Sequence, residues 1–201
     1  MGRRRGRLTV GPAARVEIET PRLRLRQWRL GDWTLLHRAY GDPEVARWIG
    51  TDPSSPEWTA YAVGRMTSHW DLRGYGSWAV EERDSGEFVG RAGLSFQADW
   101  PVGEDKVEVG WTLVRAFWGR GYATEAALAS LSYGFGDLEL PRILSLTTPA
   151  NVRSRAVMER CGMKEVATAT WRGLEHVCYA IDRSTWPPPE VLVTAARVIP
   201  A

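Results

Sequence analysis

The stretch FWGRGYATEA, residues 117–126, sets two glycines on either side of an arginine, just before a run of small residues. The apolar residues of KVEVGWTLV upstream predict a strand, and Ala127, Leu128, Leu131 and Phe135 downstream fall at helical spacing. Glycines let a backbone approach an anion that a side chain would block. The unpaired N–H groups at a helix start carry partial positive charge and attract phosphate. The stretch therefore predicts a phosphate cradle at a strand–helix junction, with an ordinary turn as the alternative.

Two common phosphate-binding motifs do not fit this loop. A Walker loop ends in Gly-Lys-Ser/Thr, and the chain contains no such ending. The dinucleotide fingerprint needs a third glycine three positions after the second, where this chain has Thr124. The order of the surrounding elements must therefore identify the loop.

That order predicts one mixed α/β domain rather than an alternating, doubly wound parallel sheet. EIETPRLRLRQW, in which Leu23 and Leu25 alternate with arginines, predicts a first strand. DWTLLHRAY predicts a helix, and residues 56–73 predict a second helix that ends at Gly74. SWAVEERDSGEFVGRAGLSF predicts a hairpin, and Gly110 in the strand after it indicates a bulge or a close backbone approach. The helix after the glycine loop should end at Gly136. ILSLTT then predicts a strand, NVRSRAVMERCGM a short helix, and MKEVATAT with EHVCYAI a final hairpin.

The length of 201 residues suits one domain, and charge is uneven along it. The four arginines of RRRGR, residues 3–7, account for the formal net charge of +2, since 22 basic and 24 acidic residues remain without them. We expect a flexible basic tail over 1–16, a folded domain over 17–186, and a C-terminal tail over 187–201 that opens with three prolines. A solvated tail is the preferred interpretation of RRRGR, and nucleic-acid binding through it is the alternative.

Cysteines and apolar runs indicate a protein of the reducing cytoplasm. Cys161 and Cys178 lack metal-ligand spacing, and the three histidines are scattered, so we expect free thiols and no metal. No apolar run approaches the ~20 residues that cross a bilayer, and the N-terminus lacks the apolar stretch of a signal peptide. We therefore expect a cytoplasmic protein without a membrane partner.

With these elements in order, the sequence resembles the GNAT family of acetyltransferases, and within it the ribosomal-protein N-terminal acetyltransferases. The family carries a strand, a Gln/Arg-x-x-Gly-x-Gly/Ala loop and a helix, and WGRGYATEA matches with Gly121 and Ala123. Trp118 replaces the first Gln or Arg, a departure common in that subgroup. ETPRLRLR, the hairpin, VEVGW and NVRSRAVMERCGM agree in the same order, so the resemblance spans about residues 17–183. It implies an α/β (α+β) fold whose central, mostly antiparallel sheet splays at the cofactor site and is flanked by helices.

The resemblance also implies a reaction and the residues that bind its co-substrate. Family members move an acetyl group from acetyl-CoA to an amine directly, without a covalent enzyme intermediate. The N–H groups of the glycine loop would cradle the CoA pyrophosphate, backbone groups near Leu113 and Val114 would pair with the pantetheine arm, and an N–H near Trp111 would hold the developing oxyanion. The implied cofactor-binding residues are Leu113, Val114, Trp118, Gly119, Arg120, Gly121, Tyr122, Ala123, Thr124, Asn151 and Ser154.

The catalytic residues that the resemblance implies are Glu108, as a base acting through water, and Ser154, near the sulfur. Asn151 and Ser154 are alternatively only caps of the short helix, and Glu108 is alternatively only a salt-bridge partner. Many family members protonate the thiolate with a tyrosine seven residues after the asparagine, where this chain has Met158, so Ser154 or water must serve instead. Glu81 and Glu125 are weaker candidates for the base, and Glu125 would rather complement the helix dipole.

An amine attacks only when it is neutral, which favours an α-amine as the acceptor. An α-amine is roughly 10–20% neutral at pH 7, a handicap of about 1 kcal/mol, against about 4.6 kcal/mol for a lysine. The resemblance places the acceptor groove between the first helices and the final hairpin. Tryptophans could line it, namely Trp28, Trp48, Trp78, Trp100 and Trp171, although each is more often part of a core.

The sequence leaves several functions open. The preferred one is an N-acetyltransferase acting on a protein N-terminus or a small-molecule amine, and an antibiotic-modifying enzyme is a variant of it whose groove should be acidic. A CoA-binding regulatory module without turnover is the alternative from another class, since the tyrosine is missing. A homodimer also stays open.

Overall fold

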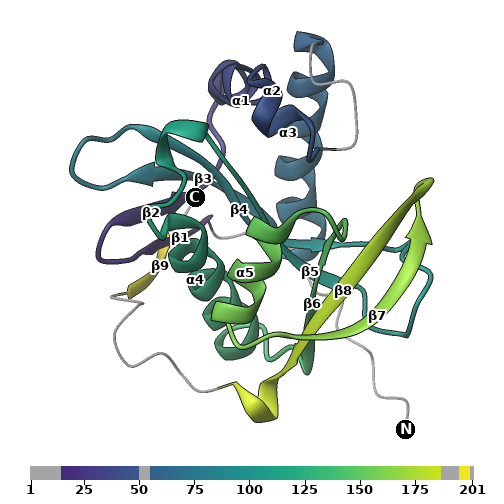
Figure 1. The fold of residues 1–201 in the computed structure, drawn as a ribbon. Coiled ribbons are helices and arrows are strands. Elements are labelled where there is room, and N and C mark those ends of the chain that lie inside the picture. Colours follow the sequence, from purple (N-terminus) through teal and green to yellow (C-terminus); the bar gives the residue numbers. More distant parts are fainter. Residues whose placement is uncertain (1–14, 50–54, 187–194, 200–201) are drawn as a thin grey trace, which may run out of the picture.

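The structure is a computed structural model that describes residues 15–49, 55–186 and 195–199. Within these residues, nine strands form one sheet in the order β7-β8-β6-β5-β4-β3-β2-β1-β9 (Figure 1). The strands are β1 (Arg15–Glu19), β2 (Leu23–Arg26), β3 (Ser77–Glu82), β4 (Phe88–Phe96), β5 (Val107–Leu113), β6 (Arg142–Thr147), β7 (Lys164–Trp171), β8 (Leu174–Asp182) and β9 (Ala195–Ile199). The helices are α1 (Asp32–Tyr40), α2 (Pro43–Ala46), α3 (Pro56–Arg73), α4 (Tyr122–Gly136) and α5 (Val152–Arg160).

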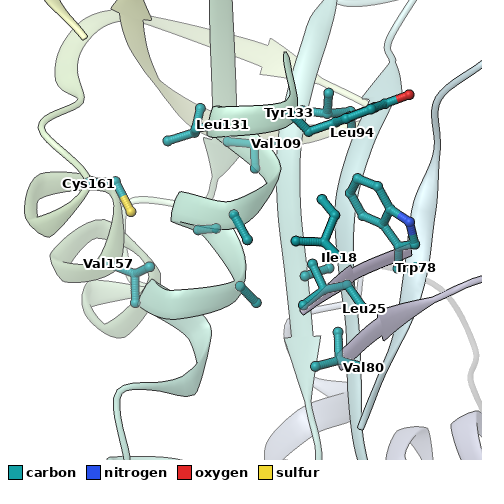
Figure 2. Packing of buried hydrophobic residues seen from close by; sticks show 14 of the residues in the cluster. Ile18, Leu25, Trp78, Val80, Leu94, Val109, Leu131, Tyr133, Val157 and Cys161 are labelled. Atoms are coloured by element: carbon teal, nitrogen blue, oxygen red, sulfur yellow. The ribbon is translucent and has the colours of Figure 1, made fainter. Parts of the chain in front are cut away.

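All neighbouring strands of this sheet run antiparallel except β5 and β6, which run parallel. The long helix α4 packs on β4 and β5 and lies in front of the sheet in Figure 1. Its buried side chains share one cluster with those of the strands; Figure 2 shows Leu131 and Tyr133 of α4 with Leu94, Val109 and Trp78 of the sheet. The predicted mixed, mostly antiparallel sheet is confirmed.

The first three helices form a second apolar cluster, around Leu36, Tyr40, Val45 and Val63, at the top of Figure 1. A buried ion pair holds this unit to the sheet: the Arg26 guanidinium of β2, 2% exposed, contacts the Asp32 carboxylate at 2.6 Å. Asp32 begins α1, so the pair fixes where the helical unit meets the sheet. The helical unit forms one wall of the cavity described below.

The structure differs from the prediction at both boundaries of the folded domain. The single strand predicted over EIETPRLRLRQW is two strands, the end of β1 and all of β2, joined by a turn at Thr20. β1 starts at Arg15, inside the stretch assigned to the basic tail. Residues 195–199, assigned to the C-terminal tail, form β9 and pair with β1 over their full length. The basic run of the first seven residues lies outside the described residues.

Two glycines behave otherwise than predicted. β5 runs through Gly110 without a bulge, and Gly110 faces Gly93 of β4 in continuous register. A Cβ on Gly110 would meet only Glu108 Oε1, at 3.8 Å, so the glycine leaves open space rather than allowing a close backbone approach. The helix α4 ends at Gly136, as predicted, but Gly136 has no positive φ, so it does not end the helix in a left-handed conformation.

Candidate active site

The parallel strands β5 and β6 separate soon after they meet. They pair at one position, Glu108 with Leu144, after which β5 stays on β4 up to Leu113 and β6 stays on β8 up to Thr147. Strands that part in this way leave backbone N–H and C=O groups facing each other without ladder partners. The sheet therefore opens into a gap at its centre, as the sequence resemblance predicted.

Hydrogen bonds show which residues of β5 face this gap. The Val114 N–H donates to Val89 O at 2.9 Å, so the even-numbered positions point their backbone groups toward β4. Ser145 Oγ of β6 donates to Val109 O at 2.8 Å, and Trp118 Nε1 donates to Leu113 O at 2.9 Å, as expected for odd positions that face the gap. Trp111 lies between these two, so its N–H and C=O also face the gap. Val114, predicted beside Leu113 as a cofactor contact, turns its N–H away.

The glycine loop presents a row of free donors beside the gap. Gly119 and Gly121 adopt left-handed φ values of 76° and 81°, and Gly121 is the N-cap of α4. The first backbone bond of the helix is that from Glu125 N to Gly121 O. Among the residues that the structure describes, the N–H groups of residues 119–124 have no acceptor. Free donors at a helix N-terminus have the geometry of an anion site, and phosphate binding by this loop stays a prediction.

One cavity of about 1060 Å³ joins the gap and the loop. Ten of the predicted cofactor-binding and catalytic residues line it, namely Glu108, Leu113, Trp118, Gly119, Gly121, Tyr122, Ala123, Thr124, Asn151 and Ser154. Val114 and Arg120 do not. The Arg120 guanidinium lies outside, over the Phe117 ring at 5.2 Å from its centroid.

A buried carboxylate ties the loop to the first hairpin. Glu125, with a side chain 3% exposed, accepts hydrogen bonds from Thr20 Oγ1 at 2.6 Å and Arg22 Nε at 2.7 Å. Arg22 in turn donates through Nη1 to Arg120 O at 2.9 Å, on the loop itself. Glu125 does not line the cavity, so it holds the loop in place and is not a base. The ETPRLRLR motif of the sequence and the glycine loop are therefore one structural unit.

The start of α5 forms the far wall of the gap. Asn151 is the N-cap of α5, and its Oδ1 accepts the Ser154 N–H at 3.2 Å. The capping alternative therefore holds for Asn151, while the Ser154 hydroxyl is not used for a cap. Met158, at the position of the family tyrosine, is 1% exposed and also lines the cavity.

Glu108 lies in the same cavity, on the strand that borders the gap. Its Oε2 accepts hydrogen bonds from Gln97 Nε2 at 2.5 Å and from Ser95 Oγ at 3.2 Å. Its carboxyl keeps some exposure toward the cavity but is otherwise enclosed by protein. Burial raises the pKa of the Glu108 carboxyl, while Gln97, Arg91, Ser95 and the backbone of Leu146 oppose the shift. In the described part of the chain no cation lies within ion-pair distance of it, so the salt-bridge alternative fails.

Glu81, the other weak candidate for a base, is committed elsewhere. Its Oε1 accepts from Arg26 Nε at 2.6 Å and lies 4.0 Å from Arg29 Nη1, away from the cavity. It belongs to the buried ion-pair network beneath α1.

The tryptophans divide between cavity and core. Trp48, just after α2, and Trp171, at the end of β7, line the cavity. Trp78 and Trp100 are buried in the core, and Trp28 donates through Nε1 to Ser77 O, so these three do not line the groove. The cavity lining does include residues of the helical unit and of the tip of the β7–β8 hairpin, where the acceptor was expected.

Sequence reasoning missed four cavity residues opposite the loop, which are Arg91, Ser95, Gln97 and His176. The first three follow from the register of β4 on β5, which sets Arg91 beside Thr112 and Ser95 beside Glu108. The residue types alone carried no signal for them. The predicted hairpin placed them on a strand but not against a particular partner.

Other expectations concern cysteines, metals and membranes. Cys161 and Cys178 are free and buried, as predicted, and burial raises the pKa of their thiols to about 12 and about 11. Across residues 15–49, 55–186 and 195–199, no group of three or more His, Cys, Asp or Glu residues is placed to hold a metal ion. None of the helices described is long and apolar enough to cross a membrane.

Comparison with known proteins identifies the family. The model of the acetyltransferase (GNAT) domain matches residues 22–164, so the chain belongs to the GNAT family. The FsC-acetyl coenzyme A-N(2)-transacetylase of Aspergillus fumigatus is 33% identical over 162 residues, which cover 72% of this chain and 67% of that protein. The putative ribosomal N-acetyltransferase YdaF of Bacillus subtilis is 33% identical over 87 residues, covering 40% of this chain and 48% of its own.

A solved structure agrees with these matches. The acetyltransferase from Agrobacterium tumefaciens superposes with a TM-score of 0.73 at 27% identity, over 90% of this chain and 99% of that one. The predicted family, its fold and its resemblance to ribosomal N-acetyltransferases are therefore confirmed. The protein is an N-acetyltransferase of the acetyl-CoA-dependent GNAT class, and the regulatory module without turnover is set aside.

Proposed function

We propose that this enzyme transfers the acetyl group of acetyl-CoA to a primary α-amine, on a protein N-terminus or a small molecule, by direct attack at the gap between β5 and β6. One observation carries the proposal: a single cavity joins the free N–H groups of residues 119–124, the open backbone of Trp111 and the Glu108 carboxyl. These are an anion site, an oxyanion donor and a base in one connected space.

The cofactor end of the cavity binds through backbone groups. The loop N–H groups hold the pyrophosphate, and the side chains of Arg153 and Arg160, which line the same cavity, add positive charge. Leu113 offers its backbone to the pantetheine arm, while Asn151 contacts CoA from the other side of the gap. The Trp111 N–H donates to the thioester oxygen, where negative charge develops.

Glu108 accepts the proton that the attacking amine loses, directly or through one water. A carboxyl with a raised pKa is better matched to this task near neutral pH than an ordinary one. As the C–N bond forms, the C–S bond breaks and CoA leaves as a thiolate. Protonation of that thiolate falls to the Ser154 hydroxyl or to water, since Met158 replaces the tyrosine of relatives.

A blocked peptide tests the choice of amine. CoA release should be measured with a peptide that has a free N-terminus and one lysine, and with the same peptide acetylated at its N-terminus. The proposal predicts turnover of the first peptide alone. Equal turnover of both would show that lysine is the acceptor and would overturn the α-amine assignment.

We also propose a cytoplasmic location, which the two buried free thiols support. Binding to nucleic acid is not expected. A homodimer stays a prediction that gel filtration with light scattering can test.

A further inference from the structure

We propose that the acceptor carries a carboxylate close to its amine, and that Arg91 binds that carboxylate while Glu108 takes the amine proton. The inference deepens the proposed function and rests on it. It assigns the chemical class of the acceptor and the residue that selects it.

The floor of the acceptor end is a strip of β4 and β5 with a charged residue near each end. Arg91 stands beside Thr112, Gly93 beside Gly110, and Ser95 beside Glu108. The middle pair carries no side chains, and the space above Gly110 is open. Ser95 is four positions beyond Arg91, which sets their Cα atoms roughly 13 Å apart. The side chains of Arg91 and of Glu108, which stands beside Ser95, reach over part of that length. A small dipolar group therefore fits over the two glycines, between the guanidinium and the carboxyl.

Arg91 is held in place but is not neutralised. Its Nε donates to the hydroxyl of Tyr40, which is 1% exposed, at 2.8 Å. No carboxylate of residues 15–49, 55–186 or 195–199 lies within ion-pair distance of Arg91. The side chain is partly buried and lines the cavity. A partly desolvated guanidinium whose outer nitrogens lack an anion is built to accept a carboxylate in a forked hydrogen-bonded pair.

The other cavity arginines are engaged or lie at the cofactor end. Arg153 stacks over Trp118 at 5.0 Å, and Arg160 donates to Thr124 Oγ1 at 3.3 Å, both beside the glycine loop. Arg172, at the acceptor end, is paired with Asp99 at 3.0 Å and stacks on Trp171. In the described part of the lining, Arg91 is therefore the cation left for the acceptor.

The charge of the lining also disfavours the opposite kind of acceptor. At the acceptor end of the described lining, Arg91 stands against the acidic residue Glu108, and Arg172 is paired with Asp99, so this end is not acidic. A polycationic acceptor such as an aminoglycoside needs an acidic groove, so this lining disfavours the antibiotic-modifying alternative.

Matched acceptors test the inference, with two arms for the two sources of a carboxylate. The peptide arm compares Asp-Ala-Ala-amide with Asn-Ala-Ala-amide, and the free amino-acid arm compares alanine with alaninamide, each rate corrected for the neutral fraction of its amine. The inference predicts that kcat/KM favours the acidic member of at least one pair by about 10- to 100-fold, as for a charge-assisted hydrogen bond. Ratios near one in both arms would overturn it, without any variant.

A variant of Arg91 then tests whether this residue causes the preference for acidic acceptors. Arg91→Gln should bring the favoured ratio close to one, and Arg91→Lys should keep part of it. Arg183→Gln is the matched control, because Arg183 forms an exposed ion pair with Glu139 far from the cavity lining. A ratio that survives in Arg91→Gln would overturn the assignment.

Failure of the inference can be told apart from failure of the proposed function. Equal turnover of acidic and neutral acceptors overturns the inference alone. CoA release from no amine at all overturns the function. In that case the inference can still be tested by calorimetric titration of the same peptides into the protein–CoA complex. Tighter binding of the aspartyl peptide than of the asparaginyl peptide supports the inference, and equal binding overturns it.

Discussion

The two ends of the cavity are built in different ways. The core of the cofactor end comes from one continuous stretch, residues 117–124, which offers backbone N–H groups, and Asn151, Arg153 and Arg160 of the α5 region border it. The acceptor end draws side chains from β4, β5, the helical unit and the β7–β8 hairpin. A site made of backbone depends on local conformation, whereas a site made of side chains depends on the register of distant strands. The first kind can be predicted from a short motif and the second cannot.

The largest predicted effect is a loss of kcat from a change at the acceptor end that leaves acetyl-CoA binding at the cofactor end unchanged. Glu108→Gln keeps the shape of the carboxyl but cannot accept a proton. We expect kcat to fall about 100-fold, the lower range for a general base, with an unchanged acetyl-CoA dissociation constant. Steady-state CoA release and calorimetry measure the two quantities. A variant that retains full activity from pH 6 to 9 would remove Glu108 as the base.

The second prediction disturbs only the cofactor end. Gly121→Val places a branched side chain at φ 81°, where the nearest atom to a Cβ is Arg22 Nη2 at 3.4 Å, and it crowds the donors of the loop. Acetyl-CoA should bind at least about tenfold more weakly, the loss of one or more charge-assisted hydrogen bonds.

Gly86→Val is the control for Gly121→Val, because Gly86 adopts a similar φ of 71° in a hairpin turn outside the cavity. It imposes comparable backbone strain and should leave the acetyl-CoA affinity unchanged. Normal binding by Gly121→Val, or an equal loss in both variants, would contradict the cradle.

The third prediction concerns the place where the two ends meet. Asn151 caps α5, so the Ser154 hydroxyl can be removed without loss of the cap. Ser154→Ala should lower kcat about 2- to 10-fold, the effect of one neutral hydrogen bond, and leave the melting temperature unchanged. An unaltered kcat would leave protonation of the thiolate to water.

The fourth and smallest effect is on stability. Because burial raises the pKa of the Glu108 carboxyl, the folded chain holds its proton at pH values where the unfolded chain, with a pKa of about 4.3, has released it. The stability that this proton confers is complete below the unfolded pKa and is lost as pH rises through the folded pKa. Glu108→Gln avoids that loss, so at pH 8 it should melt above the wild type.

Melting curves at two pH values check this effect, since the difference should disappear at pH 4. A variant that melts below the wild type at pH 8 would show that the buried carboxylate stabilises the fold. The Glu108 carboxylate at the acceptor end would then not lower the stability of the fold.

The sequence predicted the fold well where patterns are local. The glycine loop, α4 after it, the hairpin of β3 and β4, and the capped helix α5 all follow from turn residues and apolar spacing. The helix α2 was not predicted, since a four-residue helix carries little periodicity, and β1 and β2 were predicted as one strand because the turn between them is short. The strand β9 was not predicted because it pairs with β1, which is distant in sequence.

For the site, the sequence identified ten residues of the cavity but not how they are used. Val114 does not line the cavity, because strand alternation turns its N–H toward Val89. Arg120 does not line the cavity because its guanidinium packs over Phe117, although the loop N–H beside it fits the cradle. Arg91 was not predicted as a site residue because its proposed role depends on its position across two glycines from Glu108. That role also depends on the absence of a carboxylate partner for Arg91 within the described residues. Both are facts of tertiary structure.

The central claim is that the loop and the gap together bind acetyl-CoA, and thermal unfolding with added ligand tests it most directly. The wild type should be melted alone and with acetyl-CoA, ATP or NAD at the same concentration. At 100-fold excess over its dissociation constant, acetyl-CoA should add about 2.7 kcal/mol and raise the melting temperature about 5–10 °C, with no comparable shift from ATP or NAD. A well-folded protein that shows no shift with acetyl-CoA, or equal shifts with all three, would contradict the account.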